Sequence, residues 1–275
     1  MTRISSLAAA AALALSPTLA RAGTVTVKGS DTMVILVQRW AEAYMKAHPG
    51  AKIQVTGGGS GTGIAALLNG TTDIADASRP MKEEEKQKLK QVSGETGVET
   101  AVAKDGVAFY VNDANPLNQL TVEQLRDLYL GDVERWKAVG GKDAPVVLYS
   151  RENSSGTYVF VKEEVLKNQD YSARAQTLPG TAAVVNAVAK EPNGIGYGGA
   201  AYAKGVKELK VSHRAGEEAF SPTKENVQSG KYPLARNLFM YTRQKPAGDV
   251  KAFIDFCLSP EGQAIVTQVG YFPLR

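Results

Sequence analysis

The sequence predicts an α/β protein of two domains with a ligand cleft between them. Three observations favour this class. Short β-branched segments alternate with helix-like segments, and glycine- and serine-rich loops stand at the strand ends, as in parallel β–α units that bind ligands at the carboxyl edge of a sheet. The 275 residues suffice for two modest domains. Strand-like segments near the middle and the end can carry the chain out of one domain and back.

The first 22 residues have the pattern of a cleaved export signal. Arg3 precedes an apolar run at 4–15, and small residues follow it. A membrane span needs about 20 apolar residues, and this run is shorter. We expect cleavage after Ala22 and a soluble protein in the periplasm. A lipid anchor would need a cysteine at the new N-terminus, where Gly23 stands, so we expect no lipid anchor.

The elements of the first domain follow in order from residue 24. We expect a β-branched strand at 24–28, a helix with apolar residues at helical spacing at 32–46, and a second strand at 52–56. A glycine loop then leads into a helix at 64–69. Glutamates and lysines alternate at 81–90 with spacings of three and four residues, which is typical of a solvated helix surface.

The second domain is expected to begin near the strand at 107–112, where the chain first crosses over. A strand at 237–241 and a helix at 250–258 return the chain to the first domain. Two strands that join the halves form a hinge suited to closing on a ligand. Between them we expect helices at 121–130, 158–165 and 181–189, and strands at 146–149 and 195–197. The expected boundaries are 23–107 for the first part of domain I, 108–241 for domain II and 242–275 for the return segment of domain I.

Charge and cysteine content narrow the functional classes. The formal net charge is +4, and the export signal contributes Arg3 and Arg21 to it without any acidic residue. The remaining near-neutral chain gives no support to a nucleic-acid partner, whose binding face would gather basic residues. The single cysteine, Cys257, excludes an internal disulfide and is expected to be a small buried residue on its helix.

Two short segments have the pattern of an anion site. Residues 57–63 read Gly-Gly-Gly-Ser-Gly-Thr-Gly, and residues 150–157 read Ser-Arg-Glu-Asn-Ser-Ser-Gly-Thr. Each precedes a helix-like run, whose first N–H groups lack partners within the helix and attract oxyanions. Glycine permits close backbone approach, and hydroxyl groups add donors. Taken alone, 57–63 is equally compatible with a tight turn, Arg151 with a surface ion pair and Asp76 with a strand-end acid.

The order and spacing of several motifs resemble the periplasmic phosphate-binding proteins of bacterial high-affinity phosphate ABC transporters. The resemblance spans nearly the whole chain after the export signal. The motifs that carry it are Gly29-Ser30-Asp31-Thr32, the loop 57–63, the segment 73–80, Gly131-Asp132 with Trp136 and Gly140-Gly141, the segment 150–157, and Gly194-Ile195-Gly196-Tyr197. It implies a type II periplasmic binding fold that holds one phosphate in the interdomain cleft and hands it to a membrane permease, with no metal and no cofactor.

Family site positions carry over onto matching residues of this sequence. The resemblance implies that helix N-termini and one arginine converge on a buried dianion. The first ligand loop corresponds to Ser30, Asp31 and Thr32, the second to Ser60, and the far domain supplies Arg151, Ser155, Gly156 and Thr157.

One position departs from the family pattern. Well-known members have an aspartate where this chain has Ser78, and that carboxylate accepts the proton of monohydrogen phosphate. The nearest carboxylates here are Asp76 and Asp31, so the acceptor is open between them. Sulfate has no proton to give, and sites built on such a hydrogen bond reject the analogue that lacks it by a factor on the order of 10⁴. Arg79 is expected to add a second positive group to the cleft.

Other functions remain as alternatives. Binding of sulfate, molybdate, tungstate or arsenate, and a role as a periplasmic phosphate sensor or store, are rivals within the binding class. A phosphatase is the least favoured, because neither serine loop fits a nucleophile elbow. His48 stands at a helix end before Pro49, His213 lies far from the loop motifs, and no His/Cys cluster or Gly-Lys-Ser/Thr tripeptide is present. We therefore expect a monomeric binding protein and no enzymatic activity.

Overall fold

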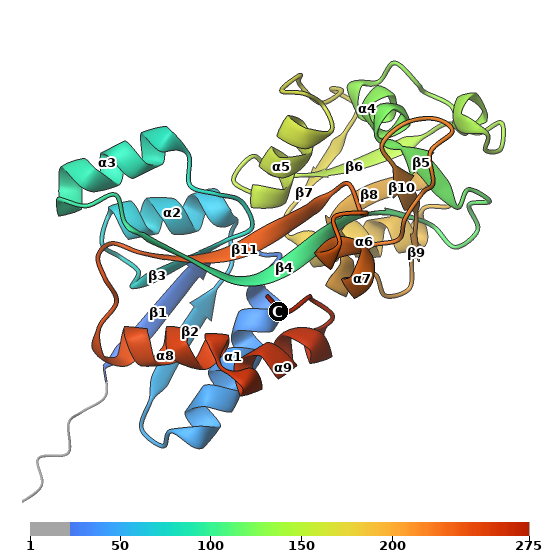
Figure 1. The fold of residues 1–275 in the computed structure, drawn as a ribbon. Helices are drawn as coiled ribbons and strands as arrows, with labels where there is room; N and C mark the ends of the chain where they lie inside the picture. The colour runs from blue at the N-terminus through green and yellow to red at the C-terminus, as the bar shows by residue number, and fades with distance from the viewer. Residues whose placement is uncertain (1–22, 275) are drawn as a thin grey trace, which may run out of the picture.

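A continuous sheet runs through both lobes of the molecule. The computed structural model describes residues 23–274, so the expected export signal at 1–22 lies outside the described residues. Within that part the sheet has nine strands in the order β2-β1-β3-β11-β4-β8-β6-β7, with β9 paired to β4 (Figure 1). The strands are β1 (Thr24–Gly29), β2 (Lys52–Thr56), β3 (Ile74–Ala77), β4 (Val98–Val111), β6 (Val147–Arg151), β7 (Gln176–Leu178), β8 (Gly194–Gly199), β9 (Lys207–Glu208) and β11 (Ala235–Thr242), while β5 (Gln119–Thr121) and β10 (Lys210–Ser212) form a separate pair.

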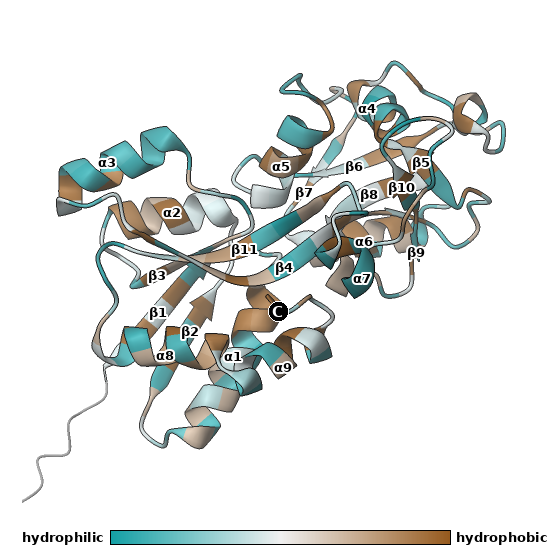
Figure 2. Cartoon of the chain, viewed as in Figure 1, coloured by the Kyte–Doolittle hydropathy of each residue, from teal (hydrophilic) through white to brown (hydrophobic). Residues whose placement is uncertain are grey.

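Helices cover the sheet in both lobes, and α3 is largely hydrophilic, whereas α2 and α8 also carry hydrophobic residues (Figure 2). They are α1 (Val34–Ala47), α2 (Ser60–Leu68), α3 (Glu83–Ser93), α4 (Val122–Leu130), α5 (Gly156–Glu164), α6 (Thr181–Lys190), α7 (Lys224–Gln228), α8 (Gly248–Leu258) and α9 (Pro260–Val269), with short 3₁₀ turns η1 (Trp136–Val139) and η2 (Ala200–Tyr202). Among residues 23–274 the helices are too short or too polar to cross a membrane.

The first lobe has three layers because its strands bury apolar side chains on both faces. On β3, Ile74 packs into a core with α1, α8 and α9, whereas Ala75 and Ala77 pack on the opposite face with α2 and α3. This alternation follows from the two-residue period of a strand. The carboxyl ends of β1 and β3 lie side by side, since Gly29 pairs with Asp76 in parallel register. Residues that follow these strands therefore meet at one edge.

The second lobe also buries apolar side chains on both faces of its sheet, around the C-terminal end of β4. Val107, Phe109 and Val111 face one core, while Ala108 and Tyr110 face another that contains residues of α6. In the same lobe β6 runs parallel to β8 and β7. Strand β6 ends at Arg151, and the short loop that follows leads into α5.

Two strands connect the lobes. The first part of β4 pairs antiparallel with β11, and its last five residues pair with β8 (Figure 1). After β11 the chain returns to α8 and α9, which pack against α1. The expected crossover strands at 107–112 and 237–241 are thus the end of β4 and part of β11.

Several elements differ from expectation. The strand expected at 107–112 begins nine residues earlier, at Val98, where Glu99, Lys104 and Asp105 interrupt the apolar pattern. Strand β3 and helix α9 were not predicted as elements. Cys257 is fully buried on α8, as expected, and burial raises the pKa of its thiol well above the ordinary value.

Candidate functional site

Two helix starts and the loop before a third meet between the lobes. Thr32, in the turn before α1, lies 2.8 Å from Thr157 of α5 between hydroxyl oxygens. Gly61 of α2 donates its N–H to the Ser154 carbonyl at 2.9 Å. A Cβ added to Gly156 would lie 2.4 Å from Ser60 Oγ. The starts of α2 and α5 and the turn before α1 therefore lie close together.

The glycine loop before α2 has a structural reason for its composition. Gly59 has φ +95°, which L side chains rarely adopt, and a Cβ there would lie 2.6 Å from the Ser154 carbonyl oxygen. Glycine therefore permits both the turn and the approach of the opposite lobe. The tight-turn interpretation and the ligand-loop interpretation of 57–63 are compatible, since the turn is what brings α2 to the cleft.

Three serines line the first lobe's side of the cleft. Ser78 donates its N–H to Ser60 Oγ at 3.0 Å, and both residues have zero exposed surface. The Ser30 hydroxyl is also buried and has no hydrogen-bond partner among the described residues. A buried hydroxyl without a partner is costly, so a ligand oxygen beside Ser30 would remove that cost.

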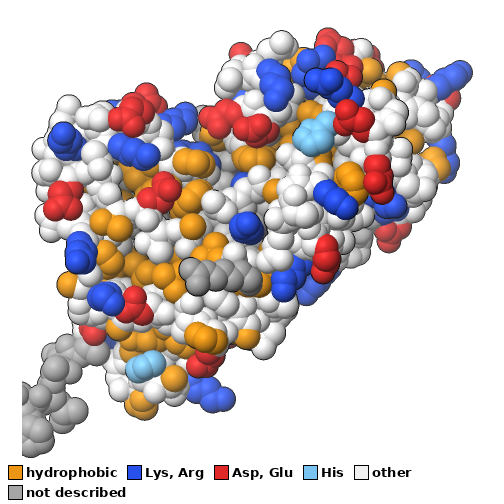
Figure 3. All heavy atoms as spheres, in the orientation of Figure 1, with side chains coloured by type: hydrophobic (Ala, Val, Ile, Leu, Met, Phe, Trp, Pro, Cys, Tyr) orange, Lys and Arg blue, Asp and Glu red, His pale blue; other side chains and the backbone are white. Residues whose placement is uncertain are grey.

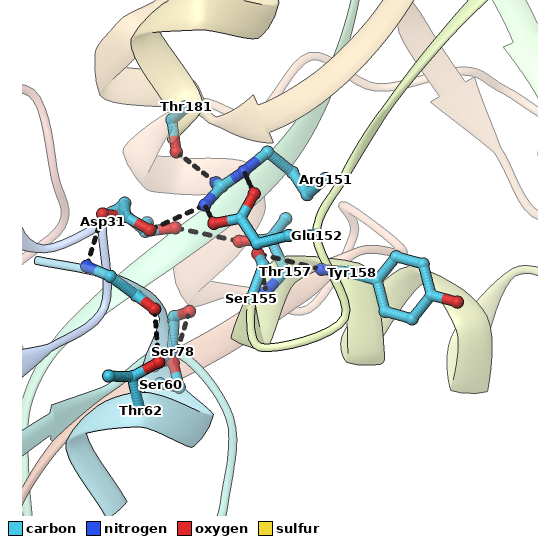
Figure 4. Close-up of polar contacts among 12 residues, drawn as sticks. Asp31, Ser60, Thr62, Ser78, Arg151, Glu152, Ser155, Thr157, Tyr158 and Thr181 are labelled. Carbon is cyan, nitrogen blue, oxygen red and sulfur yellow. Dashed lines mark hydrogen bonds and ion pairs between the residues drawn. The ribbon is translucent and has the colours of Figure 1, made fainter. Parts of the chain in front are cut away.

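Ser155 caps the helix that faces these serines. Its side-chain oxygen accepts hydrogen bonds from the N–H groups of Thr157 and Tyr158 at 3.2 and 3.3 Å. This is an ordinary N-cap, and it holds the first turn of α5 in place. The hydroxyl proton of Ser155 is left available, while Tyr158 points away from the cluster (Figure 4).

Arg151 is buried, which argues against the surface ion pair left open above. Its guanidinium lies between partners from several elements (Figure 4): Nη2 lies 2.8 Å from Asp31 Oδ2, and Nη1 donates to Thr181 Oγ1 at 2.9 Å. Nε and Nη2 also donate to Glu152 at 3.2 and 3.0 Å. Burial disfavours the charge of Glu152, but the hydrogen bonds and the charge of Arg151, together with backbone hydrogen bonds, hold the pKa of Glu152 below its ordinary value.

Asp76 is the most unusual group of the cluster. Its side chain is buried, and neither carboxylate oxygen has a hydrogen-bond partner among the described residues. Burial raises the pKa of Asp76 to about 8, and the nearby charge of Asp31 adds to the rise. The Asp76 carbonyl accepts the N–H of Ser30 at 3.0 Å, which keeps these two residues adjacent. The acid is therefore more than a strand-end residue, because its buried carboxyl has no partner and the residue it adjoins, Ser30, has an unpaired hydroxyl.

Arg79 does not join this cluster in the structure. Its Nη1 and Nη2 donate to the two carboxylate oxygens of Glu85 on α3 at 2.8 and 2.7 Å. The pair is largely buried, with 6% and 16% of the two side chains exposed. A buried guanidinium needs a carboxylate partner, and α3 supplies one. The expectation that Arg79 faces the cleft is therefore corrected: the structure directs its charge to the first turn of α3.

A second arginine, which the sequence did not single out, does reach the cleft. Arg236 on β11 pairs with the fully buried Asp105 on β4, with 2.8 Å between Nη2 and Oδ2. Its Nη1 donates to the Ser78 carbonyl at 2.9 Å, and its Nη2 donates to Thr157 Oγ1 at 3.0 Å. The available signal was an acidic residue in one mainly apolar strand and a basic residue in another.

The outer surface of the molecule carries charges of both signs. On the face shown in Figure 3, basic and acidic side chains are interspersed over both lobes. Within residues 23–274 no group of three or more His, Cys, Asp or Glu residues is placed to hold a metal ion. The cluster instead offers helix N-termini, hydroxyls, a guanidinium and an unpaired carboxyl, which together can hold an oxyanion that also has a proton to donate.

The fold and the site define a two-lobed binding protein of the type II periplasmic class. The model of the PBP superfamily domain matches residues 16–261, and the chain belongs to this family. A phosphate-binding protein PstS of Pseudomonas aeruginosa is 34% identical over 97% of this chain and 90% of its own length. A PstS of Staphylococcus epidermidis is 38% identical over 90% of this chain and 78% of its own length.

Solved structures show the same relationship. A phosphate ABC transporter substrate-binding protein with bound phosphate from Clostridium perfringens matches with a TM-score of 0.84 and 32% identity, over 92% of this chain and all of its own. An ABC-type phosphate transport receptor from Vibrio cholerae matches with a TM-score of 0.73 and 29% identity, over 90% of this chain and 99% of its own. The expected fold class is thereby confirmed.

Proposed function

We propose that this protein captures inorganic phosphate between its lobes and delivers it to a membrane ABC permease. The observation that carries the proposal is that the Asp76 carboxyl and the Ser30 hydroxyl are both buried without partners, on two residues that a backbone hydrogen bond joins near the starts of α2 and α5. Monohydrogen phosphate accepts hydrogen bonds through its oxygens and donates one through its proton. Such an ion satisfies both kinds of unpaired group at once.

We assign the anion site to the cluster between the lobes. Backbone N–H groups and hydroxyls surround the ion, Arg151 neutralises its charge, and Asp76 takes the ligand proton in preference to Asp31, whose oxygens already accept from Arg151 and Gly58. Arg79 is left out because Glu85 engages it. The proposed ligands are Ser30, Asp31, Thr32, Ser60, Asp76, Ser78, Arg151, Ser155, Gly156 and Thr157.

The domain division follows from the same proposal. Domain I comprises 23–107 and 242–275, and domain II comprises 108–241, so that β4 and β11 act as the hinge. We further propose that the leader is cleaved after Ala22, that the mature chain is a monomer free in the periplasm, and that it has no lipid anchor and no catalytic role. The relatives are named as binding proteins, which supports the last point.

Other oxyanions are less well matched to the site. Sulfate has no proton to donate, so it would leave both oxygens of the ionised Asp76 carboxylate without a donor. A purely sensory role and a phosphatase lack a supporting observation, and the relatives are named for phosphate binding or transport.

Calorimetry on ligand-stripped protein tests the proposal. The mature protein is unfolded and refolded to remove bound ions, then titrated with phosphate, sulfate and molybdate at one pH. We expect tight binding of phosphate alone. Tighter binding of sulfate or molybdate would assign the site to another oxyanion, and the absence of any binding would contradict a transport receptor.

A further inference from the structure

Arg236 contacts both sides of the cleft from the strand that joins the lobes. Its guanidinium donates to the Ser78 carbonyl at the end of β3 and to Thr157 Oγ1 at the start of α5. Only 4% of its side chain is exposed, and its partner Asp105 is completely buried. Its guanidinium carbon also lies 5.3 Å from the ring centroid of Phe160 on α5. These contacts hold the guanidinium in one place.

The contact with Thr157 bears on what that hydroxyl can do. A hydroxyl has one proton and two lone pairs. Because Nη2 of Arg236 occupies one lone pair, the Thr157 hydroxyl is left with its proton and one lone pair, and Thr32 Oγ1 lies 2.8 Å away as a partner for either. The guanidinium keeps the Thr157 proton directed away from itself, toward the space between the lobes where an anion oxygen would take it. The contact with Arg236 thus favours Thr157 as a donor, which an anion requires.

The pairing with Asp105 explains why Arg236 can do this without acting as the main counter-ion. Asp105 Oδ2 accepts from both Nε and Nη2 of Arg236, at 3.0 and 2.8 Å. The two residues face each other in the register of β4 and β11. The carboxylate offsets the positive charge, so the residue supplies direction through its hydrogen bonds more than net charge.

We propose that Arg236, held by Asp105, is a positioning residue of the anion site: it fixes Thr157 as a donor and joins β3 to α5 when the lobes are closed. This inference rests on the proposed function, because the donor it prepares is for phosphate.

The decisive variant keeps the pair neutral and polar, because removing Arg236 alone would leave Asp105 buried without a partner. The double substitution Arg236→Gln with Asp105→Asn removes the fixed donors while avoiding an unpaired charge. Arg243→Gln is the matched control, since Arg243 follows the same strand and donates to the Leu68 carbonyl at 3.2 Å, outside the cluster. Melting temperature without ligand and phosphate affinity by calorimetry are measured for each.

We expect the neutral-pair variant to bind phosphate about tenfold to hundredfold more weakly than wild type, the range for one lost charge-assisted hydrogen bond. The Arg243→Gln control is expected to bind like wild type. Arg236→Lys keeps the charge but lacks the planar fork, so it is expected to fall between the two. Should the neutral-pair protein not fold, the lysine variant provides the same comparison. Wild-type affinity in the folded variants would overturn the inference.

A double-mutant cycle separates positioning from general support of the fold. If Arg236 acts through Thr157, the neutral-pair substitution is expected to cost less than about threefold in a Thr157→Val background, because the hydroxyl it orients is gone. Losses that multiply independently would overturn the positioning role. Failure of the wild type itself to bind phosphate would overturn the proposed function and this inference together, whereas tight wild-type binding with unaffected variants would overturn this inference alone.

Discussion

Arg151 and Asp31 form a buried ion pair across the cleft, with 2.8 Å between Nη2 and Oδ2. Arg151 lies at the end of β6 in the second lobe, and Asp31 lies in the turn after β1 in the first. Only 1% of the Arg151 side chain is exposed. Asp31 is fixed in turn, because its Oδ1 accepts the Gly58 N–H at 2.8 Å. The arginine thus lies in place for a ligand that arrives between the lobes.

Truncation of this arginine is expected to weaken phosphate binding strongly. Arg151→Ala leaves a buried anion less compensated, and losses of this kind cost about 2–5 kcal/mol. Calorimetric titration of the stripped variant measures the loss. Arg135→Ala is the control, because Arg135 forms an exposed pair with Asp143 and should leave affinity unchanged. Equal affinities of the Arg151 variant and wild type would remove Arg151 from the site.

The two candidate proton acceptors can be distinguished by discrimination between ligands. Above about pH 8, where the Asp76 carboxyl is ionised, Asp76→Asn is expected to reduce the preference for phosphate over sulfate, because the amide can donate a hydrogen bond where the carboxylate only accepts. Asp31→Asn is expected to weaken binding of both ions with less change in their ratio, since Asp31 pairs with Arg151. Titration of each variant with both ions measures the ratio. The reverse result would make Asp31 the acceptor.

The sequence was sufficient to predict the fold class, whereas the assignment of the anion site stays a prediction. Strand and helix periodicity, together with turn residues, predicted β1, α1, β2, α4, α5 and α6, because these segments have clear apolar faces. The motif order predicted the cluster that includes Ser60 and Arg151, which the structure brings together.

The features that the sequence did not predict depend on contacts between residues far apart in the chain or on neighbouring elements. Arg79 was expected in the cleft, but the position of Glu85 on α3 decides where its guanidinium points. Asp105 and Arg236 are 131 residues apart, and only the antiparallel register of β4 and β11 makes them partners. Charged residues within these strands also concealed the early start of β4.

Gly156 is expected to be required for closure of the lobes. An added Cβ would lie 2.4 Å from Ser60 Oγ and 2.6 Å from Ser78 Oγ, both on the opposite side of the cleft. Gly156→Ala should therefore hinder the closed state, while alanine is a better helix former than glycine by about 1 kcal/mol within α5. We expect at least about tenfold weaker phosphate binding with no loss of melting temperature in the ligand-free protein.

Two measurements test the effect of Gly156→Ala on phosphate binding and on closure of the lobes. Calorimetry gives the affinity, and small-angle scattering compares the compaction of wild type and variant on addition of phosphate. A variant that binds and compacts like wild type would show that the serines have room to move. A variant that melts much earlier without ligand would show that the glycine is needed for folding and not for closure.

The stability of the ligand-free protein is expected to depend on pH through Asp76. Burial raises the pKa of Asp76 to about 8 in the folded chain, against about 3.9 in an unfolded one. The folded state therefore binds more protons between these values, so the free energy of unfolding falls as pH rises through this window. From about pH 5 to about pH 8 the contribution is at most about 4 kcal/mol. Burial and the charge of Asp105 raise the pKa of Glu208 to about 7, which adds a fall of the same sign.

Single substitutions distinguish the contributions of Asp76 and Glu208 to this pH dependence. Asp76→Asn is expected to flatten the decline of unfolding free energy with pH, as measured by urea denaturation of stripped protein, and Glu208→Gln is expected to remove a different part of it. The Asp76 effect should disappear at low pH, where the carboxyl is protonated in both states. Parallel pH profiles for wild type and Asp76→Asn would show that the carboxyl is solvated or paired in solution, and the assignment of Asp76 as the unpaired acceptor would then fail.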